Sequence, residues 1–101
     1  MTDPLVFRGP QGSITLTAVA LTELAARAAR SVDGVRLRRP RRAVEIAPVD
    51  GAVSVSLELG ATHGEPLPEL ARAVQERVGR ALAQATGLEV AQVDVEIAEI
   101  G

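Results

Sequence analysis

The sequence contains no cysteine and no lysine, and its only aromatic residue is Phe7. The lack of cysteine excludes thiol catalysis, cysteine-ligated zinc and disulfide bonds, and it agrees with a reducing compartment. The lack of aromatic residues requires an aliphatic core. No apolar run approaches the ~20 residues of a membrane span, and the first twelve residues lack the basic start and apolar stretch of a secretory signal. We therefore expect a cytoplasmic protein.

The size of the chain indicates one small domain. Its 101 residues are 47% hydrophobic, and a domain of this length can bury roughly two-thirds of the surface that the unfolded chain exposes. Residues 1–12 are interrupted by prolines and glycines and are predicted to form a flexible arm. Residues 13–101 are predicted to form the domain.

The first half of the domain is predicted to begin with a strand and a helix. Apolar residues alternate with polar ones from Ser13 to Thr17, which is typical of a half-buried strand. Apolar residues then recur at spacings of three and four from about Ala18 to Val32, which indicates an amphipathic helix. Thr17 is suited to cap this helix, and Gly34 is suited to a left-handed stop.

A β-hairpin is the clearest local prediction in the chain. Two alternating runs, Val44 to Ile46 and Val53 to Leu59, flank the dipeptide Asp50-Gly51. This dipeptide favours tight hairpin turns because such turns need a positive φ.

A second helix and a last strand complete the predicted order. An apolar stripe from Leu67 to Ala85 predicts a helix with Pro68 in its first turn, and Thr86-Gly87 is suited to end it. Gln92 to Ile97 alternates again and predicts a strand.

The resulting order, βαββαβ, predicts an α/β (α+β) fold. We expect a two-layer sandwich with a mixed sheet and two helices on one face, because each strand has one apolar side. A ferredoxin-like arrangement is favoured, and a KH-like order remains open. The predicted core comprises Leu24, Val55, Leu57, Val74, Val78, Leu82, Val95 and Ile97. The other sheet face is predicted to be open and to carry Glu45, Ser54, Ser56, Glu58, Asp94 and Glu96.

Charge is unevenly distributed along the chain. Residues 1–42 hold eight arginines and three acids, whereas residues 43–101 hold three arginines and ten acids. Five of the seven residues from 36 to 42 are arginine, namely Arg36, Arg38, Arg39, Arg41 and Arg42. Such a block can be a solvated loop or an anion-binding surface.

Three kinds of partner could use this arginine block. Several phosphate contacts would suit a nucleic acid, but the acidic remainder, the lack of aromatic residues and the lack of a reader motif disfavour it. Anionic lipid offers roughly 1 kcal/mol per arginine near the surface, but no amphipathic anchor accompanies the block. An acidic protein surface is the preferred partner.

The residues give little support for an enzyme. His63 is the only histidine, so neither a histidine metal site nor a catalytic triad has its second member. Asp94 and Glu96 share one side of a strand and could serve acid/base chemistry or hold a divalent ion, but alternation places polar residues there in any case. The segment Gly60 to Gly64 lacks the lysine and spacing of a phosphate loop. We expect no catalytic residue, cofactor, metal or small-molecule substrate.

Several short segments resemble a known family in their order and spacing. They are Gly12-Ser13-Ile14-Thr15-Leu16, Val32-Asp33-Gly34-Val35, Asp50-Gly51, Gly64-Glu65-Pro66-Leu67, Val74-Gln75-Glu76-Arg77-Val78, Thr86-Gly87-Leu88 and Val93-Asp94-Val95. Over roughly residues 12–97 the chain resembles the alkaline shock protein family, the envelope stress response proteins of Gram-positive bacteria. The resemblance implies a non-enzymatic scaffold protein that self-assembles and is held near the inner face of the cell membrane by a membrane-anchored partner. It implies no catalytic site.

The charge layout suggests how copies of the chain would meet. We expect the Arg36 to Arg42 segment to contact an acidic surface, either on a partner or on a second copy. The preferred acceptor is the open sheet face with Glu45, Glu58, Asp94 and Glu96. Such a contact joins different patches, so it is heterologous and builds rings or filaments.

Overall fold

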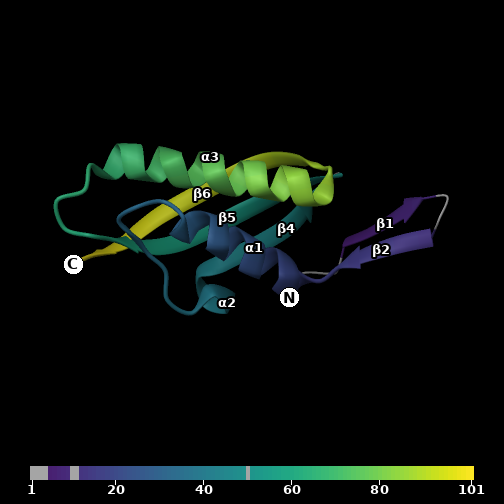
Figure 1. The fold of residues 1–101 in the computed structure, drawn as a ribbon, viewed down its shortest axis with the longest axis horizontal. Helices are drawn as coiled ribbons and strands as arrows, with labels where there is room; N and C mark the ends of the chain where they lie inside the picture. Colours follow the sequence, from purple (N-terminus) through teal and green to yellow (C-terminus); the bar gives the residue numbers. More distant parts are fainter. Residues whose placement is uncertain (1–4, 10–11, 50) are drawn as a thin grey trace.

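The computed structural model describes residues 5–9, 12–49 and 51–101 of the chain. It has an α+β fold that combines two sheets with two long helices and one short one (Figure 1). The elements follow in the order β1 (Leu5–Gly9), β2 (Gly12–Leu16), α1 (Ala18–Arg30), β3 (Val35–Arg36), α2 (Pro40–Ala43), β4 (Val44–Val49), β5 (Ala52–Ala61), α3 (Leu67–Thr86) and β6 (Glu89–Ile100).

The central strand of the main sheet is β5. Strand β6 runs parallel to it along one edge. On the other edge, β4 pairs antiparallel with Ala52 to Leu57, and β3 pairs antiparallel with Gly60 and Ala61. Two strands therefore share one edge of β5, and the sheet is mixed, as the sequence predicted.

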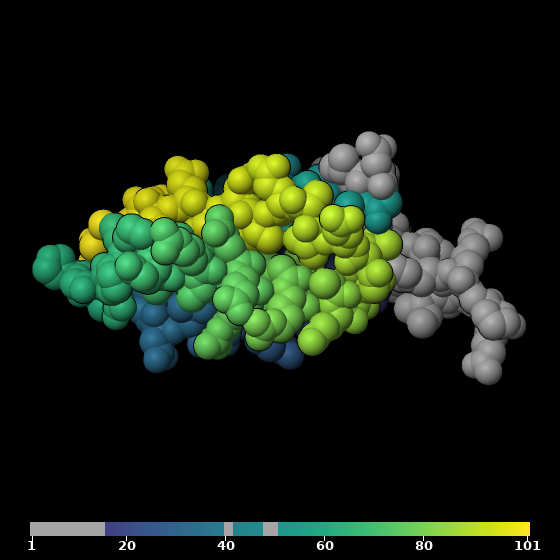
Figure 2. Space-filling model, turned by 90° about the horizontal axis from the view of Figure 1, so that it is seen from above, coloured from purple at the N-terminus to yellow at the C-terminus, as the bar shows by residue number. Residues whose placement is uncertain are grey.

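Helices α1 and α3 cover one face of this sheet. The side chains of Val53, Val55, Leu57 and Leu59 on β5 alternate into the core, where they meet buried residues of both helices. Figure 2 shows α3 lying along the molecule with β6 beside it. The predicted two-layer architecture is thus confirmed.

Most of the predicted core residues are buried. Val55, Leu57, Val74, Val78 and Leu82 are at most 2% exposed. The other three, Leu24, Val95 and Ile97, are partly buried and pack against this core. These three residues lie at the margin of the core. Val95 and Ile97 are on the edge strand β6, and Leu24 lies beside the buried stripe of α1.

The start of α1 uses the predicted cap, whereas its end differs from the prediction, because the helix stops at Arg30 with Ser31 as its C-cap rather than at Gly34. The Thr17 hydroxyl accepts a hydrogen bond from the Ala20 backbone N–H at 3.1 Å. At the other end, the Arg77 guanidinium donates to the Ser31 carbonyl at 3.2 Å and to the Ser31 hydroxyl at 3.0 Å. A cation at a helix C-terminus interacts favourably with the helix dipole, and here it also gives a partner to a carbonyl at the helix end. Because Arg77 belongs to α3, the contact also links α3 to α1.

The β4–β5 hairpin and the end of α3 confirm two further predictions. Val49 pairs with Ala52, which leaves a two-residue connection; Gly51 has φ +78°, and Asp50 lies outside the described residues. Helix α3 ends at Gly87, whose φ is +70° and whose N–H donates to the Ala83 carbonyl at 2.8 Å.

The prediction that the first strand belongs to the main sheet was wrong. Strand β2 forms close to its predicted position, but it pairs with β1 in a separate two-stranded sheet. The main sheet cannot take it at β5, because β6 occupies one edge of that strand while β3 and β4 occupy the other. A ferredoxin-like arrangement needs this strand in the main sheet and is therefore not formed.

Three elements were not predicted. Leu5–Gly9 is the strand β1, although the sequence analysis placed no element before residue 12. Strand β3 and helix α2 have two and four residues, which is too short to produce a hydrophobic period. Both overlap the arginine-rich segment, residues 36–42, for which no helix or strand was predicted.

Burial of Leu82 predicts its contribution to stability. Its side chain is 0% exposed, so Leu82→Ala is expected to lower the free energy of unfolding by about 2 to 5 kcal/mol. Chemical denaturation measures this value. Ile100→Ala, at a side chain that is 53% exposed, serves as the control and should lose much less. Equal losses for the two variants would contradict the core described above.

Two glycines of the same helix region predict opposite effects. Gly79 lies inside α3, where an added Cβ meets only the Val93 Cγ2 at 3.8 Å, so Gly79→Ala should stabilise the protein by about 0.5 to 1 kcal/mol. Gly87 has a left-handed backbone, so Gly87→Ala should destabilise it by about 1 kcal/mol. Thermal unfolding of both variants compares them directly. Destabilisation by Gly79→Ala would show that the helix cannot accept the methyl group.

Candidate functional site

The arginine-rich segment lies where the edge of the main sheet is broken. Strand β5 has ten residues, of which β4 pairs with the first six and β3 with the last two. Residues 37–43 connect the two partners and leave the edge beside Glu58 and Leu59 without a paired strand. They bring the arginines to this gap.

The connection is held at both ends. Leu37 is buried in the core, and its carbonyl accepts a hydrogen bond from the Arg30 guanidinium at 3.2 Å. The Arg39 carbonyl accepts hydrogen bonds from the N–H groups of Arg42 and Ala43 at 2.9 and 3.1 Å. Arg39 itself has φ +50°, a conformation that costs a non-glycine residue roughly 1 kcal/mol or more. The backbone of this segment is therefore held in place by the rest of the fold.

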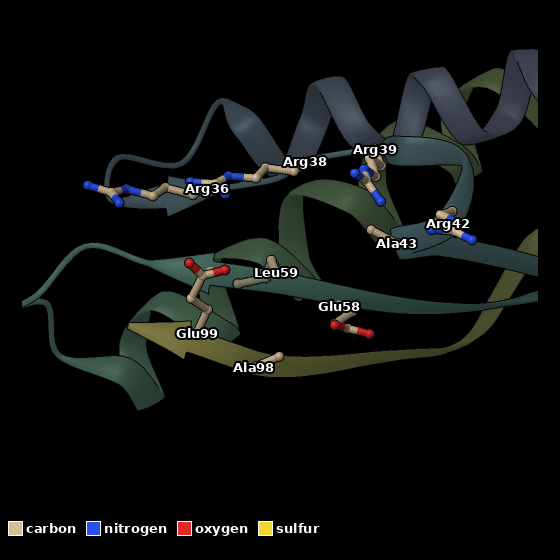
Figure 3. Close-up of a pocket in the computed structure, with 10 residues that line it drawn as sticks. Arg36, Arg38, Arg39, Arg42, Ala43, Glu58, Leu59, Ala98 and Glu99 are labelled. Carbon is tan, nitrogen blue, oxygen red and sulfur yellow. The ribbon is translucent and has the colours of Figure 1, made fainter. Parts of the chain in front are cut away.

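Four arginines line a depression of about 230 Å³ at this gap, which we call the arginine pocket. Arg36 comes from β3, Arg38 and Arg39 from the connection, and Arg42 from α2. Figure 3 shows these side chains on one side of the pocket and the glutamates of β5 and β6 on the other. The remaining lining residues are Ala43, Glu58, Leu59, Gly60, Ala98 and Glu99.

Gly60 lies between the two walls of the arginine pocket. It pairs with Arg36 of β3 on one side and with Glu99 of β6 on the other. A Cβ built at Gly60 would lie 3.4 Å from the Glu99 carbonyl oxygen and 3.5 Å from the Arg36 Cβ. These are ordinary van der Waals contacts, so a methyl group at this position would fit between the walls.

The arginines of the pocket are exposed, and their guanidinium groups have no ion-pair partner among the described residues. Within the part of the chain that the structure describes, the one ion pair joins Arg80 to Glu76 along α3. No side-chain hydrogen bond of Arg36, Arg38, Arg39 or Arg42 occurs among the described residues. Guanidinium groups recognise carboxylates and phosphates through paired N–H donors. The pocket can therefore bind an anion.

An acidic surface adjoins the arginine pocket on the open face of the sheet. Glu45 of β4, Ser56 of β5 and Asp94 of β6 form one row across the strands, and Glu58 of β5 and Glu96 of β6 form the next. These five residues line a second depression of about 270 Å³ together with Arg42, Ala43 and Leu57. We call the five the acidic rows. Glu58 faces Glu96 directly, and like charges opposite each other favour a cationic ligand.

The structure brings the predicted site residues other than Arg41 to two adjoining depressions. The four predicted acids are exposed there, as are Arg36, Arg38, Arg39 and Arg42. Arg41 lies in α2. Gly60 and Glu99 were not predicted as residues of this site, because their positions follow from the pairing of β3, β5 and β6, which no local pattern reveals.

The other candidate residues remain apart from this site. His63 is exposed, and its backbone N–H donates to the Gly101 carbonyl at 3.1 Å. Across residues 5–9, 12–49 and 51–101, no group of three or more histidine, aspartate or glutamate side chains has a metal-binding arrangement. No helix in this part of the chain has the length and hydropathy that a membrane span needs.

Comparison with known proteins identifies the family. The family model of the alkaline shock proteins, described by a cell envelope-related function, matches residues 36–101. Comparisons with curated proteins and with solved structures give no significant match. The matched region contains the whole main sheet except Val35, together with the arginine pocket and the acidic rows. Because the match covers more than half of the chain, the protein belongs to the alkaline shock protein family.

Proposed function

We propose that this protein acts in the cell envelope response as a non-enzymatic scaffold, and that it self-associates through the open face of its sheet. The main support for this proposal is that the arginine pocket and the acidic rows lie side by side. The family supports the envelope role. The scaffold operates next to the inner face of the membrane, where a membrane-anchored partner holds it.

The order of charges along β5 supports a specific contact. The row at Ser56 is flanked by Glu45 and Asp94, whereas the row at Gly60 is flanked by Arg36 and Glu99. The two rows are four residues apart on one strand, about 13 Å at the usual rise. A second copy turned end for end sets its arginines over the acidic rows of the first, and the reverse contact forms at the same time. Such a two-fold pair satisfies both patches, and it replaces the open heterologous contact expected from the charge layout, because both patches lie close together.

The same acids weigh against the nucleic-acid alternative. A polyanion that followed the arginines across the sheet would meet Glu58, Glu96 and Asp94 within two rows. Repulsion there opposes phosphate contacts. A partner surface that alternates in sign fits this face better than a uniformly negative polymer.

Salt should weaken the proposed association. Each exposed pair contributes about 0 to 1 kcal/mol and is screened, so several pairs have to act together. Sedimentation of the purified protein is expected to show larger species at low salt than at high salt. A monomer at every salt concentration would contradict self-association, and assemblies that ignore salt would contradict its electrostatic basis.

Charge variants test which residues form the contact. The triple variant Arg36→Gln, Arg38→Gln, Arg42→Gln should sediment as a monomer at low salt, as should a variant with Glu45, Glu58, Asp94 and Glu96 changed to their amides. Mixing the two variants should restore an assembly, because one retains the acids and the other the arginines. The control Arg27→Gln, Arg72→Gln, Arg80→Gln removes equal charge from exposed helix positions and should associate normally. A monomeric control, or a mixture that stays monomeric, would contradict this pairing.

His63→Ala tests whether the loop before α3 takes part in folding or assembly. The His63 side chain is exposed, so the variant should keep the free energy of unfolding within about 0.5 kcal/mol. Its sedimentation should also match that of the unchanged protein. Loss of assembly in this variant would make the loop a recognition element.

A further inference from the structure

We infer that the arginine pocket is a binding site for a single phosphate group, carried by a small phosphorylated molecule or by a phosphomonoester lipid headgroup. The site consists of the guanidinium groups of Arg36, Arg38, Arg39 and Arg42, with Gly60 between its walls. This inference concerns the pocket and does not depend on self-association through the acidic rows.

The charge of the pocket matches a phosphate monoester. Four arginines and two glutamates line it, which leaves a net charge of +2. A phosphate monoester carries about −1.5 to −2 near neutral pH, with three acceptor oxygens. The guanidinium groups come from three successive segments and make no ion pair among the described residues, so their donors are available to those oxygens. A carboxylate offers two oxygens and one charge, and it leaves part of this donor set unused.

The shape of the pocket favours a small ligand over a polymer. Its volume is about 230 Å³, and the acidic rows begin directly beside it because Glu58 and Arg42 line both depressions. A continuous phosphate backbone that left the pocket across the sheet would meet those acids. None of the described residues that line the pocket is aromatic, so they offer no ring on which a base could stack.

The backbone of the pocket is organised before any ligand binds. Leu37 is anchored in the core, and the Arg39 backbone is held in a left-handed conformation by the turn that begins α2. Strained non-glycine residues of this kind cluster at ligand sites. Fixing the backbone in advance lowers the entropy cost of gathering four long side chains around one anion.

Titration with inorganic phosphate tests the inference. Two-dimensional ¹H–¹⁵N NMR spectra are recorded on the full chain as phosphate is added, against sodium chloride of equal ionic strength. The Nε–H signals of the pocket arginines and the backbone amide of Gly60 are expected to shift with one shared dissociation constant. The absence of a phosphate-specific shift, or shifts spread evenly over all arginines, would overturn the inference.

Two variants separate a pocket from diffuse attraction. Arg38→Gln, Arg42→Gln is expected to weaken phosphate binding about tenfold or more, because it removes two charge-assisted contacts. The control Arg27→Gln, Arg72→Gln removes the same charge outside the pocket and should bind within about twofold of the unchanged protein. Equal weakening in the two variants would overturn the inference.

A third variant changes shape without changing charge. Gly60→Ala should fit the strand, since the added Cβ has ordinary contacts, and its methyl group fills part of the space between the walls. Weaker phosphate binding with an unchanged fold would support the site, and unchanged affinity would overturn it.

An experiment with lipid vesicles identifies the source of the phosphate group. The protein is sedimented with vesicles of phosphatidylcholine that contain phosphatidic acid, and with vesicles of phosphatidylcholine alone. Binding to the first vesicles only, abolished by the variant Arg38→Gln, Arg42→Gln, assigns the site to a phosphomonoester lipid headgroup. Phosphate binding without vesicle binding assigns it to a soluble ligand. A glutamate hexapeptide that binds where phosphate does not would overturn the inference in favour of carboxylates.

The variant with Glu45, Glu58, Asp94 and Glu96 changed to their amides tests the phosphate site and the proposed self-association separately. It should be monomeric and should still bind phosphate, because all four pocket arginines remain. If it stays associated yet binds phosphate, the scaffold proposal fails and the pocket stands. If it is monomeric and does not bind phosphate, the pocket fails and the scaffold proposal stands.

Discussion

Strand β5 is longer than its neighbour β4, and this difference in length determines where the charged residues of the open face lie. The central strand has ten residues and β4 pairs with six of them. A backbone edge left bare in a folded domain leaves donors and acceptors without partners. The chain supplies β3 for the last two residues of β5, and the peptide between β3 and β4 has to leave the sheet and return. The arginine pocket lies at that detour.

Alternation along β5 connects the stability of the domain with its surface chemistry. Residues of one parity, from Val53 to Leu59, form the centre of the core beneath α1 and α3. Those of the other parity present hydroxyls, a carboxylate and Gly60 to the open face. A shift of register by one residue would exchange these two sets. The aliphatic core therefore also holds the acidic rows and the arginines in their relative positions.

The two charged patches are close in space although the residues that form them are far apart in the sequence. The chain is basic up to residue 42 and acidic after it, which by itself suggests two separate poles. Folding instead places Arg36 beside Gly60 and Glu99 on adjacent strands. Arg42 then borders both depressions. The arginine pocket and the acidic rows are thus direct neighbours, so a ligand bound at one patch would alter the charge that the other patch presents.

Local patterns in the sequence determined the two long helices, the hairpin and the last strand, because each depends on residues close together in the chain. Thr17 caps α1 through a residue three positions away, Gly51 serves the β4–β5 turn, and Gly87 ends α3. The composition of the open face was also predictable, since period-2 alternation assigns Glu45, Glu58, Asp94 and Glu96 to one side. The tertiary structure decided the pairing. That β2 joins β1, that β3 and β4 divide an edge, and that Gly60 separates an arginine wall from a glutamate wall all depend on which strand edges remain free after the core has packed.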